Sequence, residues 1–350
     1  MKYLRLLLLP FSLIYGLIIL MRNWCYDACL LKSTQFDLPV ISVGNLEIGG
    51  AGKSPMTEYL IRLLTGRYKL ATLSRGYGRE TKGYFEAEHA STATQIGDEP
   101  AQFKSKFPDV TVAVCEKRVI GIERLKQDHN VILLDDAYQH RAVRPSLSIL
   151  LFDYQAITHT QWMLPAGNLR EPMSGRWRAD ILVVTKCPDD IKDDNMKYVA
   201  NKLSPLPYQT LFYSSIAYYP LQNFFDKQLT KELTLKMTVL LITGIANPYP
   251  LLKHLKNKVA QVIHHNYADH HRFSLKNITK LAEDFNELQT EKKIIVTTEK
   301  DAQRLGEHEL INLLQSLPVF VLPIGIKILN NAQNFDQLIL NDVTEHIQHR

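Results

Sequence analysis

The sequence predicts an α/β protein with two domains and an apolar segment at its N-terminus, and three observations support this fold class. The chain has 350 residues, against the ~150 residues of a typical domain. Short runs rich in Val, Ile and Leu alternate with amphipathic helical patterns, as they do where helices cover a mostly parallel sheet on both faces. Sixteen residues near the N-terminus, Leu6 to Met21, carry no charge.

The composition is that of a globular protein and excludes several other classes. Hydrophobic residues make up 45% and charged residues 22%, close to the globular average, which excludes a disordered, collagen-like or polytopic membrane protein. The net charge of +5 is small and dispersed, so we expect no nucleic-acid partner. The four cysteines lack the paired spacing of a zinc site or a redox centre. No feature of the sequence indicates an obligate protein partner.

Residues 1–22 are predicted to form a membrane-anchoring helix. At 1.5 Å per residue the uncharged run covers about 24 Å, which is shorter than the ~30 Å hydrocarbon layer. No small-residue cleavage site follows it, which argues against a secretory signal peptide. The flanking Lys2, Arg5 and Arg22 favour an anchor that dips into one leaflet or just spans the bilayer, with the protein on the cytoplasmic side. A buried core helix is the alternative.

The remaining chain is expected to form a first α/β domain over residues 23–225 and a smaller one over 226–350, divided by a polar segment. After the first strand-length run, apolar residues recur at helical spacing between positions 56 and 64. Strand-length apolar runs lie at 39–45, 69–76, 109–115, 130–136, 147–153 and 179–186 in the first domain, and at 237–245, 259–265, 292–300 and 318–324 in the second.

A glycine-rich segment, GNLEIGGAGKSP (44–55), follows the first strand and precedes its helix. Backbone N–H groups of such a turn bind phosphate oxygens, the lysine reaches the β- and γ-phosphates, and the next hydroxyl can ligate Mg²⁺. The segment departs from the usual pattern because a glutamate stands where the first glycine is expected. A tight structural turn is the alternative. We predict a P-loop NTPase-like fold whose nucleotide-binding residues are Glu47, Ile48, Gly49, Gly50, Ala51, Gly52, Lys53 and Ser54.

Asp135 and Asp136 end a later apolar run, at the position where P-loop proteins hold the carboxylate that binds Mg²⁺. Two aspartates after a strand also serve as a helix cap or a solvated turn, but beside a phosphate loop the metal role is favoured. With the Ser54 hydroxyl they are predicted magnesium ligands. His140 and Arg141 follow directly, and they either meet phosphate and the aspartates or lie at the surface.

Eight segments occur together and in order, and the set closely resembles the tetraacyldisaccharide 4′-kinases of lipid A biosynthesis. The segments are GNLEIGGAGKSP, LSRGYGR (73–79), GDEP (97–100), LLDDAYQHR (133–141), LPAGNLREP (164–172), TGIANP (243–248), YADHHRF (267–273) and TTEKDAQRL (297–305). The resemblance implies ATP and Mg²⁺ as cofactors and transfer of the γ-phosphoryl group to the 4′-hydroxyl of tetraacyldisaccharide 1-phosphate, which gives lipid IVA. It also implies a membrane-embedded glycolipid acceptor, reached from the cytoplasmic face of the inner membrane.

The resemblance assigns catalytic residues as well. Asp98 of GDEP matches the catalytic aspartate, and His270 of YADHHRF matches the histidine that works with it. We expect Asp98 to accept the proton of the 4′-hydroxyl, although the roles within the pair are exchangeable. Because the two residues lie in different expected domains, catalysis requires the domains to close. Lys53 of the phosphate loop belongs to the same catalytic set.

Arg170 and Glu171 match the Arg-Glu pair of the family, which implies an arginine on the transferring phosphoryl group and a carboxylate near Mg²⁺. A structural salt bridge between charged neighbours is the alternative. Arg75 of SRGYGR either binds a substrate phosphate or fixes its own loop. The segment TTEKDA is expected to line the cleft or the adenine side through Glu299, Lys300 and Asp301.

A rival interpretation is a membrane-tethered P-loop ATPase or GTPase switch that has no lipid acceptor. A GTP-reading switch carries an N/T-K-x-D motif that recognises the base, and TKCPDD (185–190) is a partial match. Pro188 stands at the aspartate position, so the match fails. The residues after Leu305 contain no motif that we can assign.

Overall fold

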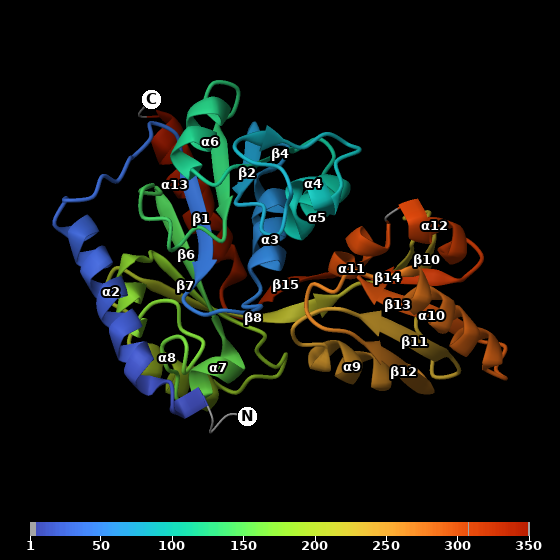
Figure 1. The fold of residues 1–350 in the computed structure, drawn as a ribbon. Coiled ribbons are helices and arrows are strands. Elements are labelled where there is room, and N and C mark those ends of the chain that lie inside the picture. Colours follow the sequence, from blue (N-terminus) through green and yellow to red (C-terminus); the bar gives the residue numbers. More distant parts are fainter. Residues whose placement is uncertain (1–4, 307, 349–350) are drawn as a thin grey trace.

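The computed structural model describes residues 5–306 and 308–348 and contains two α/β domains side by side (Figure 1). The first domain is built on a nine-stranded sheet and the second on a six-stranded sheet. Most neighbouring strands are parallel, which confirms the predicted fold class. Residues 1–4 of the expected anchor, with Lys2, and residues 349–350 lie outside the described residues.

The first sheet has parallel strands at its centre and antiparallel strands at its two edges. Its order is β15-β8-β7-β6-β1-β5-β2-β4-β3, and only β15 and β3 run antiparallel to their neighbours. The central strands are buried along their whole length, as expected for a sheet that is covered on both faces. The strands are β1 (Val40–Asn45), β2 (Leu70–Ser74), β3 (Phe85–Glu86), β4 (Thr111–Val114), β5 (Val131–Asp135), β6 (Leu147–Asp153), β7 (Ile181–Thr185), β8 (Thr210–Tyr218) and β15 (Ile324–Ile328).

Helices cover both faces of this sheet. Side chains alternate along a strand, so Leu133 joins the core on one face while Ile132 and Leu134 join the core on the other. One face is covered by α3 (Lys53–Leu64), α5 (Asp98–Lys106) and α13 (Ala332–Gln348), and the other by α6 (Arg118–Leu125) and α8 (Asp193–Leu203). Shorter helical segments are α4 (Ala93–Ile96), α7 (Tyr154–Thr158) and the 3₁₀ helix η1 (Met173–Arg178).

The N-terminal apolar segment forms α2 (Leu9–Asp27), which lies along the outside of the first domain, away from the second domain (Figure 1). Among the described residues it alone is long and apolar enough to cross a membrane, by length and composition. Its inner side is tied by hydrogen bonds, such as Ser12 Oγ to the Met163 carbonyl (3.0 Å). Its outer side exposes Phe11, Leu13, Ile14, Leu17, Ile18, Leu20 and Met21, so α2 is not a buried core helix.

The second domain repeats the layered arrangement on a smaller scale. The sheet order is β10-β9-β14-β13-β11-β12, and its four strands from β14 to β12 are parallel. Leu281 and Phe285 cover one face, and Leu251 and Leu255 cover the other. The strands are β9 (Leu221–Asn223), β10 (Thr230–Lys231), β11 (Thr238–Thr243), β12 (Gln261–Asn266), β13 (Lys293–Thr298) and β14 (Val319–Leu322). The helices are α9 (Tyr249–Lys256), α10 (Leu275–Glu287), α11 (Glu299–Leu305) and α12 (His308–Leu314).

The chain passes between the domains at two neighbouring positions. It leaves the first sheet after β8 and returns before β15, where the Tyr219 amide donates to the Pro323 carbonyl (3.1 Å). The structure therefore differs from the expected limits of 225 and 350. Residues 324–348 belong with the first domain, because β15 pairs with β8 and α13 buries its apolar face, Phe335, Ile339 and Val343, in the first core.

Phe335→Ala is expected to destabilise the first domain, although the residue lies near the end of the chain. Its buried ring contacts Phe212 and Tyr59 edge to face, with ring centroids 5.0 and 5.7 Å apart. Loss of a buried phenyl ring costs about 3–5 kcal/mol of unfolding free energy. Urea unfolding followed by circular dichroism measures this loss. The exposed Leu235→Ala is the control, expected within about 0.5 kcal/mol of the wild type. Equal stability of both variants would contradict the assignment of α13 to the first core.

Candidate active site

The glycine-rich segment forms a loop between the end of β1 and the start of α3. Gly49 and Gly52 have φ angles of +119° and +84°, in the left-handed region that favours glycine. Gly52 is the N-cap of α3, so Lys53 is the first residue of the helix. The first N–H groups of a helix have no partner within it and are therefore available to an anion. This backbone is the one that a phosphate-binding loop requires.

The Glu47 side chain contacts the segment 161–169, which explains why a glutamate is tolerated where a glycine is usual. Its Oε1 accepts a hydrogen bond from Gln161 Nε2 (2.7 Å), and its backbone forms a bridge with Leu169. Burial raises the pKa of Glu47, and the hydrogen bond from Gln161 opposes the rise. The Ile48 amide donates to the Asn168 carbonyl (2.7 Å). The segment 161–169 thus supports the phosphate loop.

Lys53, Arg170 and Asp136 converge at the start of α3. Lys53 Nζ donates to Asn45 Oδ1 (3.2 Å) and lies 3.7 Å from Asp136 Oδ1. Arg170 Nη2 lies 2.6 Å from Asn45 Oδ1 and 2.9 Å from Asp136 Oδ1. Burial opposes ionisation of Asp136, but the charges of Lys53 and Arg170 outweigh it and lower the pKa. Two cations therefore share one carboxylate beside the phosphate loop.

Asp135 lies at the carboxyl end of β5, where its Oδ1 accepts a hydrogen bond from Thr57 of α3 (3.0 Å). Burial, followed by the charges of Glu99 and Asp136, raises the pKa of Asp135 to about 7. A nearby cation would strongly stabilise the ionised form of such a carboxyl group. Ser54 precedes Thr57 by three residues, so the two side chains share one face of α3.

The oxygen atoms of Ser54, Asp135 and Asp136 fit a Mg²⁺ ion, which prefers hard oxygen ligands and usually takes one or two carboxylates from a protein. Across residues 5–306 and 308–348, no three His, Cys, Asp or Glu side chains are grouped so that they could hold a metal by themselves. A cation at this edge of the sheet therefore needs additional oxygen ligands, of the kind that phosphates and water supply.

The Glu171 carboxylate faces Arg178 and the helix α2. The residue is fully buried, its carboxylate forms an ion pair with Arg178, and Asn23 of α2 donates to it (3.5 Å). Burial raises the pKa of Glu171, with Arg178 opposing. Glu171 thus pairs with Arg178 rather than with the neighbouring Arg170, and its role near Mg²⁺ stays a prediction. Arg141 also turns to α2, where its Nη2 lies 2.5 Å from Asp27 Oδ1.

Asp98 and His270 meet across the two domains. Asp98 begins α5 of the first domain, and His270 lies in the loop after β12 of the second, with its Nδ1 2.8 Å from Asp98 Oδ2. Arg304 of α11 donates to the same oxygen from Nε (3.0 Å) and Nη2 (2.8 Å). Burial opposes ionisation of Asp98, but the hydrogen bonds from His270 and Arg304 outweigh it and lower its pKa to about 2.

The acidic and basic residues at the start of α11 lie between the domains. Lys300 Nζ is 2.5 Å from Glu99 Oε1, and Glu299 Oε1 is 2.5 Å from Lys106 Nζ. Asp301 is fully buried and accepts a hydrogen bond from the Gly244 amide (3.1 Å). These contacts place Glu299 and Lys300 between the domains, and the expected position on the adenine side stays a prediction. They form an interdomain seam between α5 and α11.

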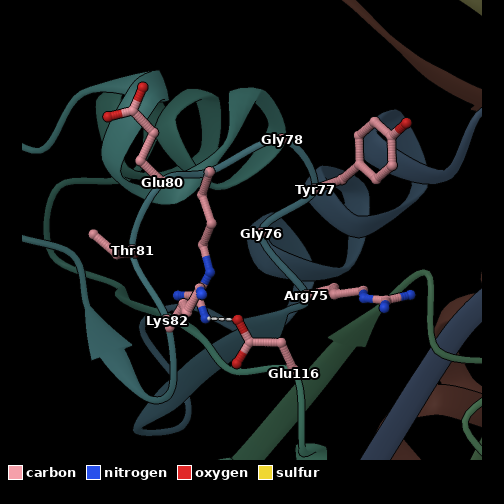
Figure 2. Close-up of a pocket in the computed structure, with 9 residues that line it drawn as sticks. Arg75, Gly76, Tyr77, Gly78, Glu80, Thr81, Lys82 and Glu116 are labelled. Atoms are coloured by element: carbon pink, nitrogen blue, oxygen red, sulfur yellow. Dashed lines mark hydrogen bonds and ion pairs between the residues drawn. The ribbon is translucent and has the colours of Figure 1, made fainter.

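Two cavities adjoin the cross-domain contact. The smaller, about 150 Å³, is lined in part by Asp98, His270 and Arg304. The larger, about 320 Å³, is walled by residues 75–82 and faced by Glu116 (Figure 2). The loop residues at positions 77 and 78 line both cavities, so the two are neighbours.

The larger cavity is rich in positive charge. Arg75, Arg79 and Lys82 line it, against Glu80 and Glu116. Arg79 Nη2 lies 2.5 Å from Glu116 Oε1. A dashed line ends on the Glu116 carboxylate in Figure 2. Within the described chain, the buried Nε and Nη1 atoms of Arg79 have no hydrogen-bond partner. A guanidinium with unused buried donors is suited to an anionic or hydroxyl-rich ligand.

Sequence reasoning missed Asn45 and Arg304. The Asn45 side chain accepts from both Lys53 and Arg170, and its position at the end of the strand before the phosphate loop was the available signal. Arg304 lies within TTEKDAQRL, but nothing local indicates that it reaches Asp98 in the other domain.

Comparisons with known proteins agree on one family. The family model described as tetraacyldisaccharide-1-P 4′-kinase matches residues 4–344. A tetraacyldisaccharide 4′-kinase of Bacteroides thetaiotaomicron is 46% identical over 97% of this chain and 93% of its own length. One from Flavobacterium johnsoniae is 42% identical over 99% and 100%. The crystal structure of LpxK from Aquifex aeolicus in complex with ATP has a TM-score of 0.74 and 30% identity, and the match covers 97% of this chain and 99% of that chain.

The pKa values of two histidines are expected to be shifted in opposite directions from the ordinary value. The hydrogen bond to Asp98 raises the pKa of His270 above 6.5, whereas burial lowers that of His140 to about 4. Because the pKa of His270 is raised, its contact stabilises the structure fully below pH ~6.5 and is lost as the pH rises through the higher value. Histidine-selective NMR titration measures both values. In Asp98→Asn the pKa of His270 should fall while that of His140 stays, and an unchanged His270 would contradict the contact.

Proposed function

The chain belongs to the tetraacyldisaccharide 4′-kinase family, and we propose that its phosphate loop and its Asp98–His270 pair together perform the family's reaction. The enzyme is an ATP-dependent kinase of lipid A biosynthesis. It transfers the γ-phosphoryl group to the 4′-hydroxyl of tetraacyldisaccharide 1-phosphate and forms lipid IVA. The observation that carries our assignment of residues is the 2.8 Å contact between His270 Nδ1 and Asp98 Oδ2.

In the nucleotide half of the site, residues 47–54 bind the phosphates of ATP through backbone N–H groups. Lys53 moves from Asp136 to the β- and γ-phosphates, because a triphosphate carries more charge than one carboxylate. Arg170, already fixed by Asn45, stabilises the charge that develops on the transferring phosphoryl group. The support for both roles is their convergence at the first turn of α3.

Mg²⁺ is held in our proposal by the Ser54 hydroxyl and the carboxylates of Asp135 and Asp136, and it neutralises phosphate charge when bound. The raised pKa of Asp135 supports this role, since a buried carboxyl group with another carboxylate beside it lacks a counter-charge. Glu171 has a supporting role, because its ion pair with Arg178 fixes the segment that carries Arg170.

The proton of the 4′-hydroxyl passes to the Asp98–His270 pair. Phosphoryl transfer proceeds through a loose transition state, so the hydroxyl must chiefly be oriented, and its proton is lost late. Asp98 is a weak base at a pKa of about 2, but it is a good hydrogen-bond acceptor that can hold the hydroxyl in line. His270, with its raised pKa, shares the proton once transfer has occurred.

The acceptor is a glycolipid that already carries a phosphate, and the cavity along residues 75–82 is our candidate for its polar head group. Arg75 and Arg79 supply cations there, and the cavity neighbours the one that contains Asp98. A head group that spans both cavities would present a hydroxyl to Asp98. Closure of the second domain then excludes water from the transferring phosphoryl group.

We further propose that α2 binds the cytoplasmic face of the inner membrane with its long axis along the surface. One side of the helix is tied to the protein, for example by the Tyr15 hydroxyl to the Arg170 carbonyl (3.1 Å), while the other side exposes leucine and isoleucine side chains. An amphipathic arrangement of this kind lies in the interface rather than across it. Arg5 and Arg22 turn instead to the protein, where they donate to the carbonyls of Gly167 (2.8 Å) and Gln139 (2.6 Å).

Asp98→Ala is expected to lower turnover by about 10²-fold or more while ATP binding is kept, because a proton-accepting and orienting group is lost. Lys53→Ala should weaken ATP binding and turnover together. Lipid phosphorylation by protein in detergent with ATP, Mg²⁺ and tetraacyldisaccharide 1-phosphate measures turnover, and calorimetry measures ATP binding. Asp128→Ala, at an exposed aspartate, is the control. Release of free phosphate from ATP without phosphorylation of the lipid would instead support the rival function, a P-loop ATPase.

Replacing Leu13 and Leu17 together by Glu is expected to reduce vesicle binding by about 10²-fold or more. The two side chains are 75% and 67% exposed on the outer side of α2, and burial of each leucine is worth about 1.5–3 kcal/mol. Sedimentation with phosphatidylethanolamine–phosphatidylglycerol vesicles measures the bound fraction. Leu235→Glu, an exposed leucine of the second domain, should bind as the wild type does. Equal binding by all three proteins would exclude α2 as the contact surface.

A further inference from the structure

We propose that Arg304 is a positioning residue for phosphoryl transfer: from the second domain it clamps the Asp98 carboxylate, so that the Asp98–His270 pair is assembled only when the domains close. This inference rests on the proposed function of that pair. It concerns a residue that donates to Asp98, Asp301 and the Gly244 carbonyl, and that acts through Asp98.

The clamp is visible in the geometry of one oxygen atom. Asp98 Oδ2 is contacted by Arg304 Nε (3.0 Å), Arg304 Nη2 (2.8 Å) and His270 Nδ1 (2.8 Å). None of these three contacts involves Oδ1, so Oδ1 is the oxygen that we assign to the acceptor hydroxyl. Two donors from one planar guanidinium converge on this oxygen and fix its position.

Arg304 is itself held rigidly within the second domain. Its side chain is 5% exposed, and its Nη1 lies 3.0 Å from the Gly244 carbonyl and 3.1 Å from Asp301 Oδ1. Asp301 is fully buried and is tied in turn to the Gly244 amide and to Thr298 Oγ1. The guanidinium is therefore placed by contacts inside its own domain, independently of Asp98.

The same short segment after β11 also holds His270. The His270 amide donates to the Gly244 carbonyl (3.0 Å), the acceptor that Arg304 uses. His270 has a φ angle of +57°, a left-handed conformation that a non-glycine residue adopts only where its surroundings impose it. A Cβ atom at Gly244 would lie 3.2 Å from Asp301 Oδ1 and from His271 Cβ. The two groups that contact Asp98 thus form one preassembled unit.

The seam between α5 and α11 brings this unit to Asp98. Lys300 pairs with Glu99 and Glu299 pairs with Lys106, while Arg304 pairs with Asp98. The contacts follow an antiparallel order, because the start of α5 meets the end of α11. Docking of one helix on the other therefore sets the register in which the guanidinium meets the carboxylate.

There is an electrostatic reason for such a clamp. A bare carboxylate beside the triphosphate is repelled by it, and a cation on the far side of Asp98 offsets this repulsion. The charged groups that act on Asp98 are His270, Arg304 and Lys300, with Glu99 and Asp301 of opposite effect. Without Arg304, His270 would be the remaining cationic partner of Asp98 and would lose a cation 3.5 Å from its Nδ1, so the pKa of His270 should rise further.

The test compares Arg304→Gln, Arg304→Lys and Asp98→Ala with Arg67→Gln, an exposed arginine of the first domain, as the control. Lipid phosphorylation is measured from pH 4.5 to 9, with ATP binding by calorimetry and melting temperature alongside. We expect Arg304→Gln to lower kcat by about 10–100-fold, to leave the ATP Kd within about twofold, and to move the acidic limb of the kcat profile to higher pH. Arg304→Lys should retain part of kcat.

The other possible results distinguish failure of the Arg304 clamp from failure of the proposed function. If Arg304→Gln keeps the wild-type kcat and pH profile while Asp98→Ala loses activity, the clamp is wrong and the proposed function stands. If Asp98→Ala is also active, the proposed roles of Asp98 and His270 fail. A fall in kcat that is equal at every pH and accompanied by a lower melting temperature in both Arg304 variants would show a merely structural role and overturn the clamp.

Discussion

The crowding of carboxylates at one edge of the first sheet is the constraint on which the rest of the structure depends. Asp135 and Asp136 end β5, and Glu99 of α5 is close enough to raise the pKa of Asp135. Like charges in a partly buried site repel one another, so the arrangement needs cations opposite them. The first domain supplies part of this charge and the second domain the rest, through Lys53, Arg170, Lys300 and Arg304. The second domain is therefore held against the first largely by charge.

The topology is compatible with movement of the second domain toward and away from the first. The second sheet is inserted between two neighbouring strands of the first, β8 and β15, and both connections run side by side. The Tyr219 amide and the Pro323 carbonyl join these connections at the crossing. Rotation about so narrow a joint changes the distance between α5 and α11 but leaves both cores intact. The ionic seam and the narrow joint are the two features that the proposed closure of the domains requires.

The parts of the fold that local signals determine could be predicted from the sequence. The strand, glycine-rich turn and helix of residues 40–64 follow from hydrophobic spacing and turn chemistry. Residues 324–348 were expected in the second domain, and this was wrong because β15 pairs with a strand that precedes that whole domain. Arg304 escaped notice for the same reason, since its partner lies in the other domain. Glu171 shows a different limit: a metal ligand and a buried ion pair require the same residue type, and nothing local in the sequence indicates that Arg178 is its partner.

The docked face of α2 gives the apolar helix a second role. The helix is bonded to the segment that holds Arg170 through Ser12, Tyr15 and Asn23, and Arg5 reaches the Gly167 carbonyl (2.8 Å) from the preceding turn. Shortening the protein at its N-terminus to improve solubility would therefore remove a brace from Arg170 as well as an exposed apolar surface. The apolar helix and the segment that carries Arg170 are mechanically one unit.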